Sequence, residues 1–231
     1  MQAHTQSIQN KKLIISGIKK LVLGIAILGS FLFLCGGDIQ YWNAWLYLIT
    51  LAASIFFFGV YLYKKDRVLL EKRLNAKEKE EEQKAYVFIA SISFLATFGA
   101  CGLDHRFGWS NVPLVVVIIA LAAMLAGYGL FVLTIMHNRF ASRTVEIQNE
   151  QKVIDTGVYS VIRHPLYTAA LIMFFSSPVV LGSYYAAIPM ILYLAAIIFR
   201  IRNEEKVLSN GLDGYASYMK KVRYKLIPFI W

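Results

Sequence analysis

The residues that could do chemistry in this chain gather in two short segments near its C-terminal end. The first, residues 156–167, combines a turn glycine, an arginine, a histidine, a proline and two tyrosines just before a long apolar run. The second, residues 200–205, begins directly after that run ends. Ionisable side chains at a membrane edge cost free energy to keep there, so they usually mark a functional site. Because the two clusters bracket one hydrophobic hairpin, we expect them to meet in space.

In the first cluster, Gly157 permits backbone angles that are closed to other residues, and Pro165 fits the first turn of a helix. His164 is therefore expected at a helix N-terminus near the membrane interface, with Tyr159 and Tyr167 nearby. A lone histidine at this place would be an ordinary interfacial residue. The grouping of these side chains favours a pocket instead.

In the second cluster, Arg200 and Glu204 are four residues apart and share one helix face. A solvated ion pair is the plain interpretation of this spacing. However, Arg200 is the first charge after 35 uncharged residues, 165–199. It lies at the depth where an arginine would meet an anionic headgroup or an anionic substrate.

The elements that must position these clusters are predicted to be membrane helices. Of 231 residues, 58% are hydrophobic and 16% are charged, whereas soluble domains carry roughly 25% charged residues. About 20 apolar residues cross the hydrocarbon core. The 35-residue run is too long for one span, and Gly182-Ser183 at its middle predicts two short helices joined by a tight turn. The expected fold is an all-α integral membrane protein of about six spans, at residues 21–37, 39–63, 85–103 and 107–136 and in the two halves of 165–199.

The net charge of +10 does not indicate a nucleic-acid partner, because the basic residues collect in alternate loops. An excess of Lys and Arg marks the cytoplasmic side, so the alternation predicts six spans with both termini in the cytoplasm. The four basic segments are residues 11–20, 64–84, 139–163 and 220–225. We expect one membrane domain, 1–231, in which residues 1–137 hold four spans with a cytoplasmic linker at 64–84, and residues 138–231 hold the catalytic region.

Other polar features have plainer interpretations. Residues 104–109 are read as a cap between two spans on the outer side, and His137-Asn138-Arg139 as either a helix end or part of the pocket. Cys35 and Cys101 are interpreted as small apolar fillers, with a disulfide as the alternative. Two cysteines are too few for a metal site built on thiolates, so no metal is expected.

The clusters resemble the integral membrane methyltransferases of the isoprenylcysteine carboxyl methyltransferase family, and their relatives the phospholipid N-methyltransferases. The resemblance covers roughly the last 80–90 residues, and it is the order and spacing of the pieces that make it specific. The matching pieces are Gly157-Val158-Tyr159, Arg163-His164-Pro165-Leu166-Tyr167, Arg200 with Glu204-Glu205, Tyr215-Ala216-Ser217-Tyr218, Arg223-Tyr224 and Leu226-Ile227-Pro228.

This resemblance implies S-adenosylmethionine as the cofactor, in a cytoplasm-facing pocket near the C-terminus. The family's cofactor contacts carry over to Gln151, Lys152, Val153, Ile154, Tyr159, His164, Pro165, Leu166, Tyr167 and Glu204. The carboxyl-methylating members have a histidine where Gln151 stands. The resemblance also implies a catalytic set of Arg200, Glu204 and Glu205. The arginine for a substrate carboxylate aligns with Arg200, and a one-residue gap would make it Arg202.

The leading hypothesis is a methyltransferase whose lipophilic or lipid-linked acceptor, favoured by Arg200 to be a carboxylate, enters from the surrounding membrane lipids. A phospholipid amine is the alternative acceptor. An NADPH-dependent membrane reductase of the steroid-reductase type is a second enzyme class. A small lipid-binding or transport protein would place polar residues near the membrane midplane, whereas here they concentrate at the predicted cytoplasmic ends.

Overall fold

The computed structural model describes residues 2–75, 81–138, 140, 147 and 150–231, with the backbone alone at 2–10, 75 and 81–83. These residues form helices and connecting turns and contain no β-strand, so the all-α prediction is confirmed. The elements are α1 (Gln2–Gly36), α2 (Trp42–Lys65), α3 (Arg67–Asn75), α4 (Glu81–Phe107), α5 (Leu114–His137), η1 (Gly157–Ser160), α6 (Pro165–Val180), η2 (Tyr185–Ala187), α7 (Met190–Gly211) and α8 (Tyr215–Lys221).

Among the described residues, five stretches of helix are long and apolar enough to cross a membrane. They are Lys11–Gly36 in α1, Trp42–Lys65, Lys84–Phe107 in α4, Leu114–His137, and Tyr185–Gly211, which covers η2 and α7. The sixth predicted span is α6, which has 16 residues. At 1.5 Å per residue it is about 24 Å long, which is shorter than the roughly 30 Å hydrocarbon core. The break within 165–199 is confirmed, because Gly182 turns the chain there with φ +83°.

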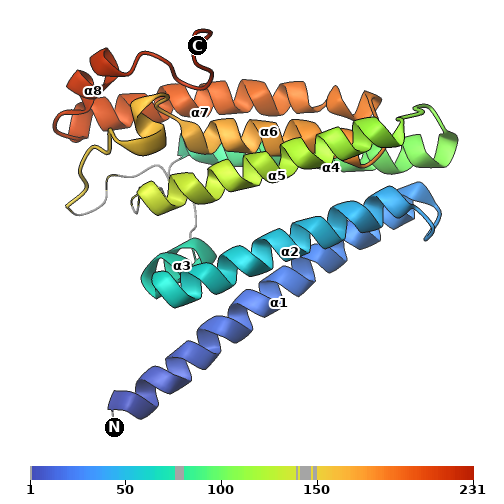
Figure 1. The fold of residues 1–231 in the computed structure, drawn as a ribbon, viewed down its shortest axis with the longest axis horizontal. Coiled ribbons are helices and arrows are strands. Elements are labelled where there is room, and N and C mark those ends of the chain that lie inside the picture. Colours follow the sequence, from blue (N-terminus) through green and yellow to red (C-terminus); the bar gives the residue numbers. More distant parts are fainter. Residues whose placement is uncertain (1, 76–80, 139, 141–146, 148–149) are drawn as a thin grey trace.

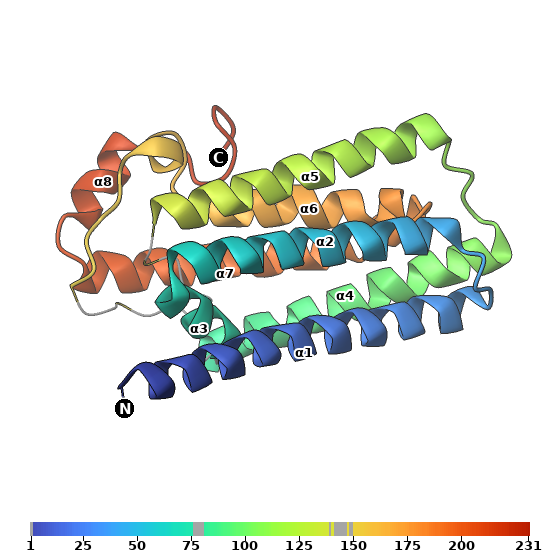
Figure 2. The same ribbon diagram turned by 60° about the horizontal axis from the view of Figure 1, so that its bottom comes forward.

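The helices run back and forth between two ends of an elongated bundle (Figures 1 and 2). Helices α1 and α2 lie on one side with α3, while α6 packs along most of α5, and α4 packs against α1 and α7. Helices α6 and α7 follow each other in the chain, but each makes its main contacts with another helix. The predicted hairpin of the last two spans therefore connects α6 to α7 in the chain, but each of these helices packs mainly against another helix.

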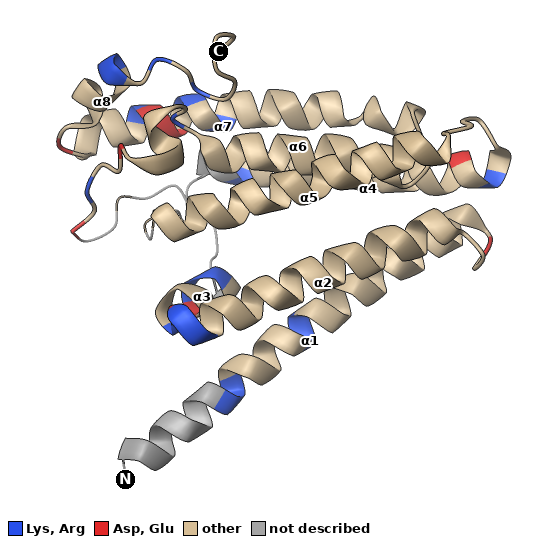
Figure 3. Ribbon diagram, viewed as in Figure 1, with Lys and Arg blue, Asp and Glu red and all other residues tan. Residues whose placement is uncertain are grey.

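Charged residues concentrate at the ends of the bundle, and Figure 3 shows the blue residues mostly at the end where α3 and α8 lie. We call this the basic end. The other end carries Asp38, Asp104 and Arg106. Lys20 on α1 lies at the level of α3 and donates a hydrogen bond to the backbone oxygen of Leu74. The separation matches the alternation of basic loops seen in the sequence.

At the opposite end, buried polar side chains tie three connections together. The Asp104 carboxylate accepts hydrogen bonds from the backbone N–H of Ser110 at 2.6 Å, from its hydroxyl at 2.6 Å and from the Ser183 hydroxyl at 2.5 Å. The Tyr41 hydroxyl donates to the Leu181 carbonyl at 2.5 Å. Because buried polar groups need partners, this network explains Asp104 as a structural cap.

Two expectations fall partly outside the described residues. The linker 64–84 contains the separate helix α3, which Asp66 caps by accepting a hydrogen bond from the Leu69 N–H at 3.0 Å, but residues 76–80 are not described. Much of the basic segment 139–163 also lies outside them. Cys35 and Cys101 are both free thiols.

Candidate functional site

The site is built around the short turn η1 that leads into α6. Gly157 opens it with φ +59°, and a Cβ at this position would lie 2.4 Å from the His137 ring. Glycine is the residue that accepts both this angle and this approach at no steric cost. Pro165 then occupies the first turn of α6, where its missing N–H is not needed. Together these two residues place His164 at the N-terminus of α6, where it is the N-cap residue.

The C-terminal tail holds the η1–α6 segment in place. The backbone N–H groups of Arg163 and His164 donate to the carbonyls of Tyr224 and Lys225, each at 2.9 Å. The Tyr218 hydroxyl of α8 donates to the Tyr159 carbonyl at 2.8 Å. The loop before α6 is thus fixed by residues about 60 positions later in the chain.

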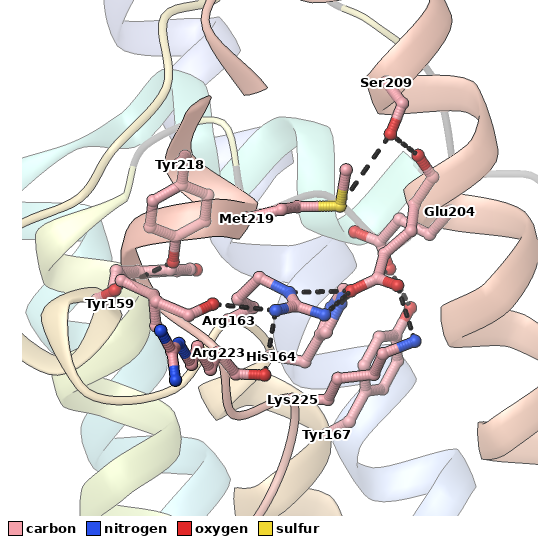
Figure 4. Close-up of polar contacts among 12 residues, drawn as sticks. Tyr159, Arg163, His164, Tyr167, Glu204, Ser209, Tyr218, Met219, Arg223 and Lys225 are labelled. Atoms are coloured by element: carbon pink, nitrogen blue, oxygen red, sulfur yellow. Dashed lines mark hydrogen bonds and ion pairs between the residues drawn. The ribbon is translucent and has the colours of Figure 1, made fainter. Parts of the chain in front are cut away.

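Glu205 lies beneath this loop, with its side chain 11% exposed. Its Oε1 accepts a hydrogen bond from Arg163 Nε at 2.8 Å and lies 3.1 Å from His164 Nε2, while its Oε2 is 2.7 Å from Lys225 Nζ. Arg163, His164 and Lys225 gather in one place (Figure 4). Charge-assisted bonds of this kind are strong, and a buried carboxylate needs them. Glu205 lies on α7 and therefore connects this helix to the residues between η1 and α6 and to the C-terminal tail.

A second chain of hydrogen bonds runs through Tyr167. Arg200 Nε donates to the Tyr167 hydroxyl oxygen at 2.8 Å, and this hydroxyl donates to Glu204 Oε2 at 2.7 Å. The Arg200 guanidinium also lies 4.5 Å from the centre of the Tyr86 ring on α4. Arg200 is only 5% exposed, so the interpretation as a solvated surface ion pair is wrong. A tyrosine from α6 stands between the arginine and the glutamate.

One cavity at the basic end is lined by residues at the end of α5, around η1 and the start of α6, on α7 and on α8. All ten positions predicted to contact the cofactor face it, and so does Arg200, whereas Glu205 and Arg202 are not among its lining residues. The full lining is Asn138, Phe140, Gln151, Lys152, Val153, Ile154, Tyr159, Arg163, His164, Pro165, Leu166, Tyr167, Arg200, Glu204, Leu208, Leu212, Tyr215 and Tyr218. We grouped Glu205 with the catalytic residues. It does not line the cavity, and it instead bonds to Arg163 and His164, which do.

Some lining residues were missed as site residues. Leu208 continues the helix face of Glu204 one turn further, a spacing that could have predicted it. Leu212 follows after α7 ends. Asn138 was left between a helix end and a pocket role, and it has both, because it is the C-cap residue of α5 and also lines the cavity. Phe140 carried no signal in the sequence, because nothing in its neighbourhood suggests a contact across the bundle.

The tyrosines of the cavity that lie outside the membrane helices stay protonated. Burial raises the pKa of Tyr159, Tyr215 and Tyr218 well above the usual value. They are therefore neutral hydroxyl groups and aromatic surfaces at any physiological pH. At the edge of the site, Asp155 is exposed, and the hydrogen bond and charge of Lys221, 2.7 Å away, hold the pKa of its carboxyl below the usual value.

The donor set of the cavity fits a polar, positively charged organic ligand. Glu204 presents a carboxylate that is 27% exposed, and the neutral tyrosines supply rings that attract a cation. The segment 151–154 also lines the cavity. Among the described residues, no group of three or more His, Cys, Asp or Glu side chains is placed to hold a metal ion.

Comparison with known protein families gives a match in the second half of the chain. Residues 114–210 match the model of the isoprenylcysteine carboxyl methyltransferase (ICMT) family. This region belongs to the ICMT family. It starts at the first residue of α5, contains η1 and α6, and ends one residue before the end of α7. A comparison with curated proteins gives no match.

The ICMT-family region and the cavity coincide in large part. The match takes in the cavity-lining positions from Asn138 to Leu208, and the remaining three, Leu212, Tyr215 and Tyr218, follow directly. The ICMT-family match, together with the five long apolar helices among the described residues, supports a membrane methyltransferase of the ICMT type. Helices α1 to α4 and α8 lie outside the match.

Proposed function

We propose that this protein transfers a methyl group from S-adenosylmethionine to a lipophilic or lipid-linked acceptor, with a carboxylate as the accepting group. The observation that carries the proposal is the convergence of all ten expected cofactor residues on one cavity. They come from three separate stretches of chain and from the ICMT-family region.

The donor set suits S-adenosylmethionine. When bound, the cofactor supplies a methyl group carried on a positively charged sulfur. Glu204 can accept hydrogen bonds from hydroxyl groups or balance the positive charge, and Tyr159 and Tyr167 can face the cation. Methyl transfer needs no covalent enzyme intermediate, so positioning and the exclusion of water are the protein's main contributions.

We propose that Arg200 binds the anionic group of the methyl acceptor. It lines the same cavity and lies one hydrogen-bonded hydroxyl away from Glu204. A guanidinium pairs well with a carboxylate, through two parallel hydrogen bonds. The same positive charge disfavours a phospholipid amine in this position. The acceptor's anionic group and the cofactor would therefore be held on two sides of Tyr167.

The whole chain is proposed to be one membrane domain with six crossings and both termini in the cytoplasm. Support comes from the basic end, where Figure 3 shows α3 and α8. Residues of α8 line the cavity. Excess Lys and Arg favour the cytoplasmic side. Helix α6 would be the remaining span, since it runs along α5 and the turn at Gly182 that follows it lies at the opposite end, where Ser183 bonds to Asp104. The cavity would then open to the cytoplasm.

The proposal is tested by incubating the purified protein with radiolabelled S-adenosylmethionine and a total lipid extract, and identifying the labelled product. A base-labile methyl ester is the expected product. A labelled amine headgroup would instead assign the protein to N-methylation. The control is heat-inactivated protein in the same extract.

Thermal unfolding separates the enzyme classes. S-adenosylhomocysteine is expected to raise the unfolding temperature, because a ligand that binds only the folded state stabilises it. NADPH is expected to leave it unchanged. Protection by NADPH alone would overturn the methyltransferase proposal in favour of a reductase.

A further inference from the structure

An apolar groove lies between α1, α2, α3 and α5, apart from the cavity. It is lined from residues 13–21, 55–63 and 70–74, together with Tyr128 and Phe131. Figure 1 shows α1 and α2 close together at the opposite end and diverging toward the basic end, where α3 lies beside them. The divergence leaves apolar side chains of both helices uncovered.

The groove is accessible from the lipid side. Ile14, Ile18 and Phe56 line it and are between 39% and 48% exposed. Gly59 also lines it, and a Cβ added there would meet no atom within 4 Å. A hydrocarbon chain can therefore lie against α2 without displacing protein atoms.

The basic end of the groove carries positive charge. Arg73 lines it with its guanidinium 5.1 Å from the centre of the Phe131 ring. Lys20 is held nearby by its hydrogen bond to the Leu74 carbonyl. A groove that is apolar along its length and cationic at one end complements an amphiphile with a hydrocarbon chain and an anionic headgroup.

We propose that this groove binds one acidic phospholipid, with an acyl chain along α1 and α2 and its phosphate at Arg73 and Lys20. The groove and the cavity share no lining residue, so the lipid is distinct from the methyl acceptor. Apart from Tyr128 and Phe131, the groove is also built outside the ICMT-family region. This site therefore goes beyond the proposed methyl transfer.

The lipid would support the methyltransferase site through a common core. Leu62 and Phe131, from the groove, pack in one apolar cluster with Ile135 and Leu166. Leu166 also lines the cavity. Lipid bound in the groove would thus stabilise the wall from which the cavity residues of α6 project.

Native mass spectrometry of the delipidated full-length protein tests the site with two lipids of identical chains. Dioleoyl phosphatidylglycerol is expected to remain bound at one molecule per chain, more tightly than dioleoyl phosphatidylcholine. One basic residue near a membrane surface contributes about 1 kcal/mol, so the preference should be about fivefold or more. The Arg73→Ala, Lys20→Ala double variant should lose the preference but still bind both lipids.

Gly59→Leu places a side chain in the groove and should abolish retention of both lipids. The matched control is Gly24→Leu on α1, because that glycine also has open space at Cβ but does not line the groove. Unchanged retention in Gly59→Leu, or no preference for phosphatidylglycerol in the unmodified protein, would overturn the site. Displacement of phosphatidylglycerol by equimolar N-acetyl-S-farnesylcysteine would assign the groove to the acceptor instead.

Discussion

The Tyr167 hydroxyl connects two residues that the sequence presents only as helical neighbours. Arg200 and Glu204 are both bonded to it, at 2.8 and 2.7 Å. Arg200 is buried, and burying its charge costs free energy unless partners such as this hydroxyl compensate for the lost water. The arrangement lets one residue serve the acceptor and the other the cofactor while each constrains the other's position.

We predict that Arg200 and Glu204 have separable roles. Arg200→Ala should reduce methyl transfer by at least 100-fold, since positioning the acceptor contributes several kcal/mol, and it should leave affinity for S-adenosylhomocysteine nearly intact. Glu204→Gln should weaken that affinity by about tenfold or more, because a hydrogen bond to a charged group is worth roughly 1.5–3 kcal/mol. Isothermal titration and turnover on the same two variants provide the measurement. Parallel loss of cofactor affinity in both would place Arg200 with the cofactor.

Glu205 is predicted to act on stability rather than on chemistry. Its carboxylate is bonded to Arg163, His164 and Lys225 beneath the cavity. Glu205→Gln leaves these groups without their common anion, and breaking a buried ion pair costs about 3–5 kcal/mol. Thermal unfolding in detergent should therefore show a large decrease for Glu205→Gln and a small one for the matched Glu204→Gln. Equal decreases in the two variants would contradict this assignment.

Among the elements, η1 and the C-terminal segment that begins with α8 both line the cavity, through Tyr159, Tyr215 and Tyr218. Neither is long enough to be stable alone, and they exchange hydrogen bonds with each other from positions about 60 residues apart. Helix α8 begins after Gly214, which has φ +83° and allows the chain to turn back toward η1. The tail thereby brings Tyr215 and Tyr218 to the cavity.

Gly157→Ala tests how closely η1 must approach α5. The residue combines φ +59° with 2.4 Å between an added Cβ and the His137 ring. A non-glycine residue at positive φ costs on the order of 1 kcal/mol or more, and the ring contact adds to that. We expect a lower unfolding temperature and weaker binding of S-adenosylhomocysteine, with Gly24→Ala as the control.

The double variant Gly157→Ala, His137→Ala separates the two causes. Removing the ring should restore part of the lost stability but not the part that comes from the backbone angle. No recovery at all would mean that the ring does not limit the turn.

At the scale of the whole molecule, the site depends on which ends of the helices share one side of the membrane. The cavity, α3 and α8 lie at the basic end, and the Asp104 network lies at the other. The orientation proposed above therefore places the cofactor in the cytoplasm. The same orientation puts the turn between α6 and α7 outside.

Cysteine labelling tests this orientation in a Cys35→Ala background. Cysteines at the exposed positions Asp213 and Ser217 should react with an impermeant maleimide only from the cytoplasmic side. A cysteine at Tyr185, which is 56% exposed, should react only from outside. Ser183 would be a poor reporter, because it is buried. Labelling of Ser217 and Tyr185 from the same side would exclude α7 as a membrane span.

Hydropathy and local chemistry determined much of this protein before any contact was known. Uncharged runs predict the long helices, because the spanning length depends only on how many apolar residues follow one another. The turn at Gly182 and the helix start at Pro165 are equally local. The ten expected cofactor positions follow from the family resemblance, which rests on the order and spacing of the matching pieces, and all ten line one cavity.

Only the tertiary structure decided how these residues are partnered. Glu205 adjoins Glu204 in sequence, yet the 100° step between consecutive helical residues points it away from the cavity and toward Arg163, His164 and Lys225. Tyr167 bridges Arg200 and Glu204, and Phe140 lines the cavity, because separate elements meet there. A single sequence carries no signal for how close two such elements lie. The short length of α6 was likewise not evident, because an apolar run does not reveal where within it a helix ends. Local pattern thus determines which segments are helices and which residues are chemically capable, and packing determines which of those residues share a site.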